Sequence, residues 1–431
     1  MSMNRRDFLT KATTLAAAGV LTPAMFPAKA ARAGVPAKDT AAQLTTYNWG
    51  NPSEAKAYGE ALERFRKIYP NVTVQDNIAP ISSWSDYADK LVTQIAGGNP
   101  PDIINIAVEG LRLAVEKQLL MPLDELIAAD PEAKVLVDKI PAKLKDALTV
   151  DGKLYEIPNG GQTMVIHYNT RIFKEAGVEP PKPDWTWDDF VAIAKKLTTG
   201  EGDKKIYGYG LPWFNFAIHP WYLTNGTYPV TADFKHSNLN DPKIREVAEF
   251  IHALVYEHGV SPDPIGLNVY DQFAAGRFAM VGAGRWPVTG WVANGFTDFD
   301  IVPWPRKASA ETVFGCGGWG ISPQSKNPEL AFQAIKQLIS LETVTALMEI
   351  GQQIPIYEEA ARKESFLSAP KSAPVFFDAL KKAKPVAAPA FFNALDRILG
   401  RTFDQIITEE LTAEEALAAA HEELEVEIQR G

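Results

Sequence analysis

The sequence contains a single cysteine, Cys316, among 431 residues. One cysteine forms no intrachain disulfide and cannot assemble a cysteine-based zinc or iron–sulfur site. The six histidines are scattered and no HExxH motif occurs, so a zinc-hydrolase site has little basis. G-x-S-x-G and Walker A patterns are also missing, and with them the usual signals of a serine hydrolase or an NTPase. We therefore expect no metal, no cofactor and no catalysis.

Long apolar runs and basic stripes are scarce as well. No segment reaches the roughly 20 unbroken apolar residues that a membrane-spanning helix needs. The formal net charge is −10, which argues against nucleic acid and anionic membrane surfaces as partners. With 46% hydrophobic and 22% charged residues the composition is that of a globular protein, and the length predicts two domains.

The first 33 residues have the pattern of an export signal. MNRRDFLTK carries the Arg5-Arg6 pair, a short alanine-rich apolar run follows, and small-x-small sites end at Ala30 and Ala33. This order resembles a twin-arginine signal peptide, so residues 1–33 are predicted to be removed by cleavage near Ala30 or Ala33. Since Cys316 lies far from that region, no lipid anchor is expected, and the predicted location is the periplasm.

Strands and helices alternate from residue 43 onward. Residues 43–49, 72–75 and 102–107 are apolar or β-branched and predict strands, while 53–69 and 84–96 show helical spacing. A β-α-β-α-β order predicts a mostly parallel sheet flanked by helices, with ligands beyond the carboxyl ends of its strands. The pattern then restarts at residue 152 with further strands and with a helix that Thr186 and Asp189 cap, which predicts a second α/β domain.

The order of these segments resembles family 1 extracellular solute-binding proteins of ABC importers, the group that includes maltose-binding proteins. No single motif decides this, but six occur in the right order. They are FRKIYPNVTV (65–74), PDIINI (101–106), LLMPLDEL (119–126), GKLYEIP to TWDDF (152–190), FAAGRFAMVGAGRW (273–286) and GWGISPQSKNPELAFQAIKQLIS (318–340).

The resemblance implies two α/β lobes, each with a mostly parallel sheet flanked by helices, joined by crossover hinge strands with a ligand cleft between them. The implied first lobe comprises 40–157 and 304–341, and the second comprises 163–300 and 345–431. The implied hinges lie near 157–162, 302–304 and 341–345. The implied function is the periplasmic capture of a sugar by a monomer that delivers it to ABC permease subunits in the membrane.

Sugar binding requires flat rings for the apolar face of a pyranose and planar polar groups for its hydroxyls. Tryptophans at loop positions supply the rings, and the stretch GAGRWPVTGW (282–291) places one beside bare backbone. By position in the family pattern, Trp286 is the foremost stacking residue, while Gln162 and Glu109 are expected on hydroxyls. The full expected set is Trp49, Asn51, Ser83, Trp84, Glu109, Gln162, Trp213, Asn215, Trp221, Arg285, Trp286, Gly318 and Trp319.

Two residues bear on the kind of sugar. Ile106 stands where the maltose-binding relatives carry an aromatic residue, so a monosaccharide or small glycoside is expected in place of a long maltodextrin. Arg285 is unusual for a neutral sugar. It either pairs with Glu109 or Asp271 or binds an anionic group on the ligand, such as a carboxylate or a sulfonate.

Other functions stay open at this point. Twin-arginine export favours an exported enzyme as an alternative, either a glycosidase with paired carboxylates or a cofactor-dependent oxidoreductase. Residues 315–320 match the dinucleotide pattern G-x-G-x-x-G, but no helix is predicted to start directly after them. A binding protein for an amino acid, a peptide or a polyamine is a further alternative.

Overall fold

The computed structural model describes residues 34–50, 52–79, 84–367 and 370–430. The expected signal segment 1–33, together with Asn51 and Ser83, lies outside the described residues. Within the described ranges, no helix combines the length and the apolar character that crossing a membrane requires.

The first sheet has the strand order β13-β12-β4-β1-β2, with β3 paired to β1 and β7 paired to β12. β1 is parallel to β2, β3 and β4, as the alternation of strands and helices predicts. β12 returns antiparallel to both β4 and β7. The strands are β1 (Ala42–Trp49), β2 (Val72–Gln75), β3 (Ile78–Ala79), β4 (Ile103–Ala107), β7 (Ile157–Thr163), β12 (Val313–Ile321) and β13 (Lys384–Pro385).

Helices cover this sheet by burying one apolar stripe each. In α2 the buried residues Tyr58, Leu62 and Phe65 recur at helical spacing, and the helix packs against α14 and α15. The helices and small strands of this part are α2 (Pro52–Ile68), α3 (Trp84–Ala96), α4 (Val108–Glu116), α5 (Asp124–Ala129), α6 (Pro131–Asp138), α7 (Ala142–Ala147), β5 (Thr149–Val150), β6 (Lys153–Leu154), α14 (Pro328–Leu338), α15 (Leu341–Glu349), α16 (Glu358–Ala361) and α17 (Glu364–Leu367).

The second sheet has the order β11-β8-β10-β9 and is mixed. Its β8 is antiparallel to β10 and β11, and only β9 and β10 run parallel, so the expected parallel character holds for the first sheet better than for this one. The predicted capping box of Thr186 and Asp189 is present at the start of α9.

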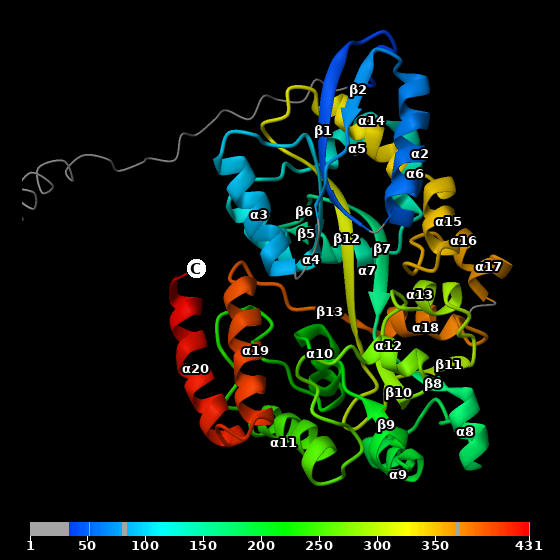
Figure 1. Cartoon of the computed structure of the whole chain (residues 1–431). Helices are drawn as coiled ribbons and strands as arrows, with labels where there is room; N and C mark the ends of the chain where they lie inside the picture. The colour runs from blue at the N-terminus through cyan, green and yellow to red at the C-terminus, as the bar shows by residue number, and fades with distance from the viewer. Residues whose placement is uncertain (1–33, 51, 80–83, 368–369, 431) are drawn as a thin grey trace, which may run out of the picture. The chain divides into compact units, whose positions relative to one another are not determined.

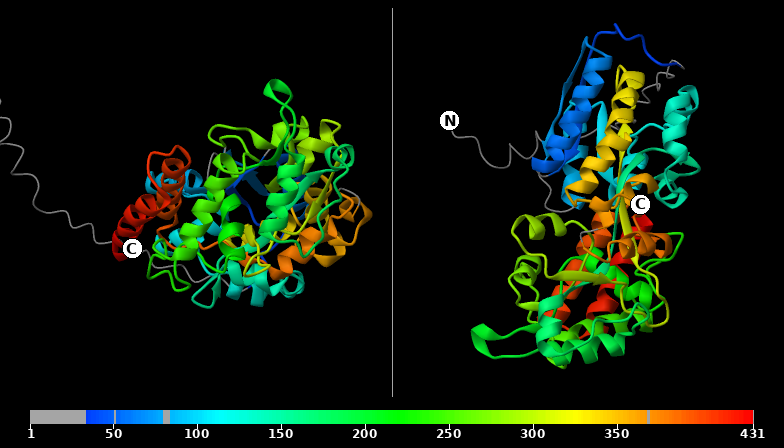
Figure 2. Two further views of the ribbon diagram at one scale, coloured as in Figure 1. Left: turned by 90° about the horizontal axis from the view of Figure 1, so that it is seen from below. Right: turned by 90° about the vertical axis from the view of Figure 1, so that its right-hand side faces the viewer.

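The strands of the second sheet are β8 (Val165–Asn169), β9 (Tyr207–Gly210), β10 (Phe278–Ala283) and β11 (Phe299–Val302). The remaining helices are α8 (Thr170–Ala176), α9 (Trp187–Leu197), α10 (Asn215–Thr224), α11 (Pro242–Tyr256), α12 (Val269–Ala274), α13 (Val288–Ala293), α18 (Pro374–Lys382), α19 (Phe392–Ile407) and α20 (Ala413–Arg430), with a 3-10 turn at Gly202–Lys204. The terminal helices α19 and α20 pack together and lie side by side in both views of Figure 2.

The chain passes between the two sheets along β7 and β12, which pair over much of their length (Figure 1). Only Met164 separates β7 of the first sheet from β8 of the second, and residues 303–312 separate β11 from β12. The third expected hinge, 341–345, has a different structure. These residues form the start of α15, which packs against α2 beside the first sheet, so no strand crosses there.

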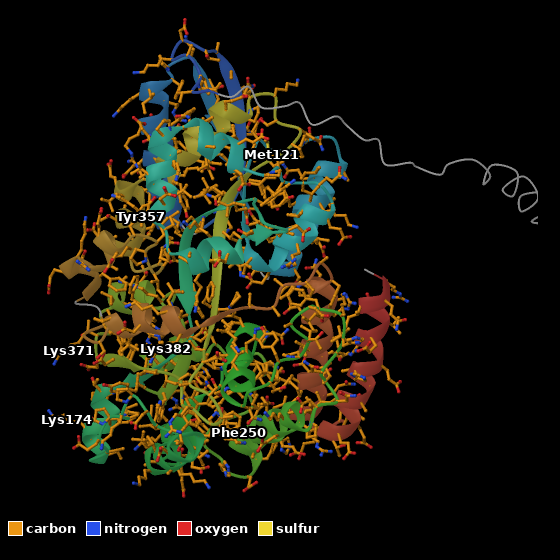
Figure 3. All side chains as sticks on the ribbon, turned by 180° about the vertical axis from the view of Figure 1, so that it is seen from behind. Met121, Lys174, Phe250, Tyr357, Lys371 and Lys382 are labelled. Atoms are coloured by element: carbon orange, nitrogen blue, oxygen red, sulfur yellow. The ribbon has the colours of Figure 1, made fainter. Side chains whose placement is uncertain are left out.

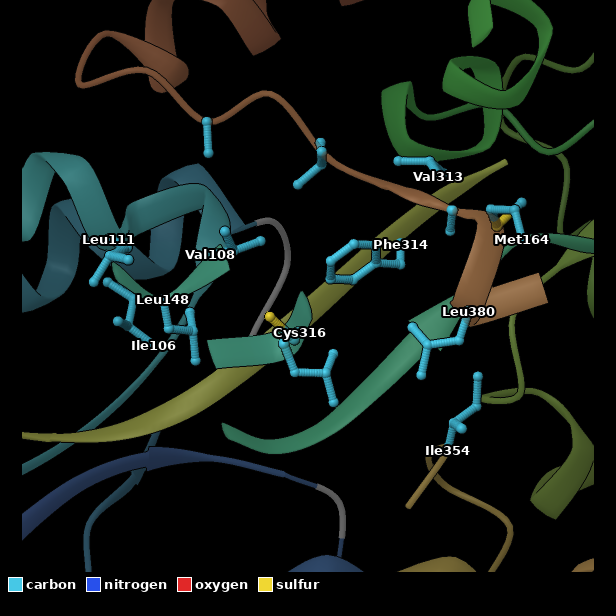
Figure 4. Packing of buried hydrophobic residues seen from close by; sticks show 14 of the residues in the cluster. Ile106, Val108, Leu111, Leu148, Met164, Val313, Phe314, Cys316, Ile354 and Leu380 are labelled. Atoms are coloured by element: carbon cyan, nitrogen blue, oxygen red, sulfur yellow. The ribbon is translucent and has the colours of Figure 1, made fainter. Parts of the chain in front are cut away.

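The core is continuous around the crossing strands. Phe314 and Cys316 of β12 lie two residues apart among buried apolar side chains, as Figure 4 shows. Tyr357, labelled in Figure 3, is buried and donates its hydroxyl to Ile339 O over 2.7 Å. The labelled lysines Lys174 and Lys371 are exposed, which is the usual position of a charged side chain.

Trp221, expected at the ligand site, belongs to this core. It is 0% exposed and lies edge-on to Trp187, Phe190 and Trp304 at ring distances of 5.0 to 5.3 Å. A ligand has no access to its faces. Its helix α10 is buried on every side from Ala217 to Thr224.

Replacing this side chain tests its structural role. Trp221→Ala is expected to lower the free energy of unfolding by about 3–5 kcal/mol, because it removes a large, fully buried ring and leaves a cavity. Chemical denaturation followed by circular dichroism measures the change. A variant as stable as the parent would contradict the assignment of Trp221 to the core.

Candidate binding pocket

A pocket of about 520 Å³ lies where the carboxyl ends of the first sheet meet elements of the second. β1 and β4 end at it with Trp49 and Ala107, and the crossing strands β7 and β12 contribute backbone at 159–162 and 315–317. The volume is within the usual range of small-molecule sites, and ligand sites of parallel sheets occupy this position. The lining residues from the other elements are Trp84, Glu109, Phe214, Asn215, Phe216, His219, Tyr270, Trp286, Gln352, Gln353, Val386, Phe392 and Asp396.

Aromatic rings form two walls of the pocket. Trp49 and Trp84 meet edge to face at a ring distance of 5.0 Å. Trp286 has Phe214, Phe216 and Tyr270 around it at 6.1 to 6.3 Å. The three tryptophans are half-buried, so each keeps ring surface open to the pocket. Such rings stack on the C–H face of a sugar ring or on another flat apolar group.

The backbone of the loop that carries Trp286 is held by a buried and a half-buried side chain. His167 Nε2 lies 3.0 Å from Gly284 O, and Arg285 N donates to Gln162 Oε1 over 2.8 Å. Burial lowers the pKa of His167 to about 3, so this imidazole is neutral and donates Nε2–H to the carbonyl. Gln162 Nε2 in turn donates to Gln352 O over 2.6 Å. These bonds hold both polar groups of the Gly284–Arg285 peptide, directly before the residue that precedes the tryptophan.

Gly284 is required by the position of the indole. A Cβ atom at this residue would overlap the six-membered ring of Trp286 and would crowd Gln162 Oε1. The ring therefore folds back over bare backbone, which only glycine provides.

Arg285 points away from the pocket. Its side chain is 2% exposed, its guanidinium lies 4.3 Å from the centre of the Phe366 ring, and Nη2 donates to Met348 O over 3.4 Å. Among the described residues it forms no ion pair, so the expected pairing with Glu109 or Asp271 is wrong. Burial lowers the pKa of Arg285 to about 10, and the group stays charged at neutral pH. It anchors the loop against α15 and α17.

Glu109 lies in the first turn of α4 and lines the pocket while only 5% exposed. Its Oε2 has no hydrogen-bond partner among the described residues. Burial, with a smaller contribution from Asp396, raises the pKa of Glu109 to about 7. Asp396 has partners: its carboxylate accepts from Asn215 Nδ2 over 2.6 Å and from Ser85 Oγ over 3.4 Å.

Hydrogen bonds join α3, beside the first sheet, to α19 at the rim of the pocket. Asn393 Nδ2 donates to Asp89 Oδ1 over 2.7 Å and to Ser85 O over 3.4 Å. Together with the bond from Ser85 to Asp396, these contacts form a bridge between the two helices, which we call the α3–α19 bridge. Helix α19 also packs on α10, α11 and α20 beside the second sheet, so the bridge ties the two sides of the pocket together.

Six of the expected residues line the pocket: Trp49, Trp84, Glu109, Gln162, Asn215 and Trp286. Five others do not, and Trp221 and Arg285 are among them for the reasons given above. Trp319 is 1% exposed and packs edge-on against Tyr58 at 5.2 Å. Trp213 donates Nε1–H to Asp404 over 2.6 Å outside the pocket. Gly318 serves close packing, since a Cβ there would meet Glu156 and Leu148.

The dinucleotide pattern at 315–320 lies within strand β12 and opens no helix, so no helix N-terminus is available for a pyrophosphate.

Sequence reasoning missed several lining residues. Phe214 and Phe216 flank Asn215 at the start of helix α10, so their closeness in sequence to that expected residue could have indicated them. Phe392 and Asp396 are four apart on α19, a spacing that places them on one face of the helix. Nothing in the local sequence shows that this face meets a pocket whose other lining residues are spread from Trp49 to Val386.

Comparisons with known proteins agree with this arrangement. A model of the bacterial extracellular solute-binding protein family matches residues 60–374. An uncharacterized ABC transporter extracellular-binding protein of Pyrococcus horikoshii is 26% identical, covering 61% of this chain and 60% of the relative. The maltotriose-binding protein of Pyrococcus abyssi is 24% identical over 60% of this chain and 52% of its own length. The matches thus span between about half and three fifths of these relatives.

A solved structure shares the fold. An ABC substrate-binding protein from Listeria monocytogenes in complex with cycloalternan superimposes with a TM-score of 0.80 at 25% identity, covering 90% of this chain and 100% of that one. The two-lobed α/β binding-protein fold expected from the sequence motifs is thereby confirmed. Because the family model matches well over half of the residues, the chain belongs to the bacterial extracellular solute-binding proteins.

Proposed function

We propose that the protein is the substrate-binding component of an ABC importer and that it captures a mono- or small oligosaccharide or glycoside in this pocket. The observation that carries the proposal is the set of three half-buried tryptophans, Trp49, Trp84 and Trp286, which face the pocket together with amide side chains. Rings and amides are the groups that recognise the apolar face and the hydroxyls of a sugar. The maltotriose-binding relative and the cycloalternan complex support the same class of ligand.

An anionic sugar receives no support from the pocket. Neither lysine nor arginine occurs among the described residues that line it, and Arg285 is buried against Phe366. An anionic ligand would face Glu109 and Asp396 without a compensating cation, which disfavours it.

Capture is proposed to involve closure of two lobes built around the two sheets. Met164 and residues 303–312, where the chain changes sheets, are the proposed hinges, and 341–345 move with the first lobe as part of α15. A ligand that contacts both lobes stabilises the closed form by its differential affinity for that form. The closed monomer then docks on permease subunits in the membrane, after export through the twin-arginine signal 1–33 and cleavage near Ala30 or Ala33 into the periplasm.

A saccharide screen tests this function. We expect one saccharide, or a small group of them, to raise the melting temperature, because a ligand at 100 times its Kd stabilises the native state by about 2.7 kcal/mol. Differential scanning fluorimetry measures the shift, and chromatography of the incubated sugar checks for products. The proposal would be overturned if none of the sugars raised the melting temperature. Steady formation of a product would also overturn it and would indicate a glycosidase.

Trp286 provides a test at the level of one side chain. Trp286→Ala is expected to weaken saccharide binding at least tenfold, about 1.4 kcal/mol, because a stacking face is lost. Titration calorimetry measures the affinity. Trp213→Ala is the matched control, since Trp213 is also half-buried but contacts Asp404 outside the pocket. The Trp213→Ala variant should bind the saccharide with the affinity of the parent protein. Equal affinities in all three proteins would exclude the stacking role.

The α3–α19 bridge gives a separate test of closure. Asn393→Ala removes two hydrogen bonds between the helices, each worth about 0.5–1.5 kcal/mol, and should accelerate ligand dissociation several-fold. Stopped-flow tryptophan fluorescence measures the rate. Lys90→Ala on the same helix α3 removes only a surface ion pair with Asp86 and serves as the control. If the ligand dissociates from Asn393→Ala and from Lys90→Ala at the same rate as from the parent protein, the bridge has no part in holding the closed form.

A further inference from the structure

The charged groups of the pocket are all acidic. Of the described residues that line it, Glu109 and Asp396 are the two that carry carboxyl groups, and none is a lysine or an arginine. His219 adds no positive charge, because burial lowers its pKa to about 3. Its Nδ1 is held by the hydroxyl of Tyr228 at 3.0 Å. The remaining polar side chains are neutral amides and the Tyr270 hydroxyl, so the negative charge of the pocket has no internal counterpart.

Glu109 has an open hydrogen-bonding position. Its side chain is 95% buried, and Oε2 has no donor among the described residues although the residue lines the cavity. A buried carboxylate oxygen without a donor loses its hydration and gains nothing in return, which costs free energy. In a binding protein the missing donor is naturally supplied by the ligand.

Asp396 adds negative charge near Glu109 but donates no hydrogen bond to Glu109 Oε2. Both of its carboxylate oxygens accept hydrogen bonds from neutral donors, Asn215 Nδ2 and Ser85 Oγ, and no cation pairs with it among the described residues. The two carboxyl groups are close enough for Asp396 to raise the pKa of Glu109. The other titratable groups that interact with Glu109 are the Cys316 thiol and the Tyr228 hydroxyl, and burial holds both pKa values above their ordinary ranges.

We propose that the saccharide bound here carries a protonated amine, whose ammonium group donates to Glu109 Oε2 and lies within the field of Asp396. This inference rests on the proposed function and specifies the substrate class as an amino sugar or an amine-bearing glycoside. The sugar rings stack on Trp49, Trp84 or Trp286, and the amine occupies the acidic end of the pocket beside α4 and α19.

A neutral hydroxyl would satisfy the open oxygen but would supply no positive charge to Asp396 or to the ionised form of Glu109. An ammonium group supplies three donors and the opposite charge at once. The aromatic walls add to the preference, because the faces of tryptophan rings attract cations. The same charge distribution is expected to repel carboxylated and phosphorylated sugars.

Binding of an ammonium group also has a proton linkage. The free protein holds Glu109 with a pKa of about 7, raised by burial and by Asp396, so most of it is protonated at pH 6. An adjacent cation favours the ionised form and lowers this pKa, so binding at pH 6 releases a proton. Affinity for the amine therefore increases as the pH rises from 6 to 7, whereas a neutral sugar brings no cation to Glu109 and releases a smaller fraction of a proton.

The test compares sugars that differ in one substituent. Each sugar is titrated into the full mature chain by calorimetry at pH 6, in two buffers of different ionisation enthalpy. One set compares glucosamine with N-acetylglucosamine and glucose, as monomers and as β-1,4-linked dimers. A second pair compares 6-amino-6-deoxyglucose with glucose. We expect at least one amine to bind tenfold or more tightly than its neutral counterparts, with release of a proton. Neutral sugars that bind as well as their amines would overturn this inference and leave the proposed function intact. If none of these sugars or of the wider saccharide screen binds, the proposed function itself fails.

Variants separate the role of Glu109 from general electrostatics. Glu109→Gln is expected to lower affinity for the amine at least tenfold, to abolish proton release, and to change affinity for the neutral counterpart less than threefold. Glu116→Gln is the matched control, since it makes the same charge change at the exposed end of the same helix. Asp396→Asn is the second variant, in which affinity for the amine falls while Glu109 is retained. Parent-like amine binding in both Glu109→Gln and Asp396→Asn would overturn the inference.

Discussion

The antiparallel pairing of β7 with β12 is the constraint on which the rest of the molecule depends. Both strands connect the two sheets, and both present backbone to the pocket through glycines at 160, 161, 315 and 317. At Gly160 a Cβ would overlap the Gln353 amide, which instead donates to Asn159 O over 2.9 Å. The pocket floor is therefore made largely of main chain, and most side chains reach the pocket from its walls. A ligand in contact with this floor lies against the same two strands that connect the sheets.

The walls differ in how rigidly they are built. On the side of the second sheet, the residues before Trp286 are held by His167 and Gln162, and Arg285 is packed behind them against Phe366. This indole is therefore placed before any ligand arrives, which reduces the entropic cost of binding. Opposite it, Trp84 begins the helix α3 that the α3–α19 bridge connects to the other side through Ser85 and Asp89.

Much of the fold was predictable from the sequence, because strands and helices in α/β proteins have distinct periods and cap signals. The strands ending at Trp49 and Ala107 and the capping box at Thr186 are present as expected. Positions at strand ends could also be assigned to the pocket, and Glu109 and Gln162 are there. Side-chain direction could not be predicted. Trp221, Trp319 and Arg285 have the residue types of a sugar site, but tertiary packing turns them into the core. Helix α19 lines the pocket through Asp396 because segments distant in the sequence come into contact, and the local sequence contains no signal of that contact.

The lone cysteine has a consequence for chemistry at the site. Cys316 is buried on β12 and lines the cavity, so the one thiol of the chain borders the ligand space. Burial raises the pKa of that thiol, and without a second cysteine an oxidised sulfur has no partner in the chain with which to form a disulfide. The thiolate is the reactive form of cysteine, so a buried thiol that stays protonated at neutral pH reacts slowly with electrophiles. The one sulfur at the site therefore behaves as a small apolar group beside the ligand space.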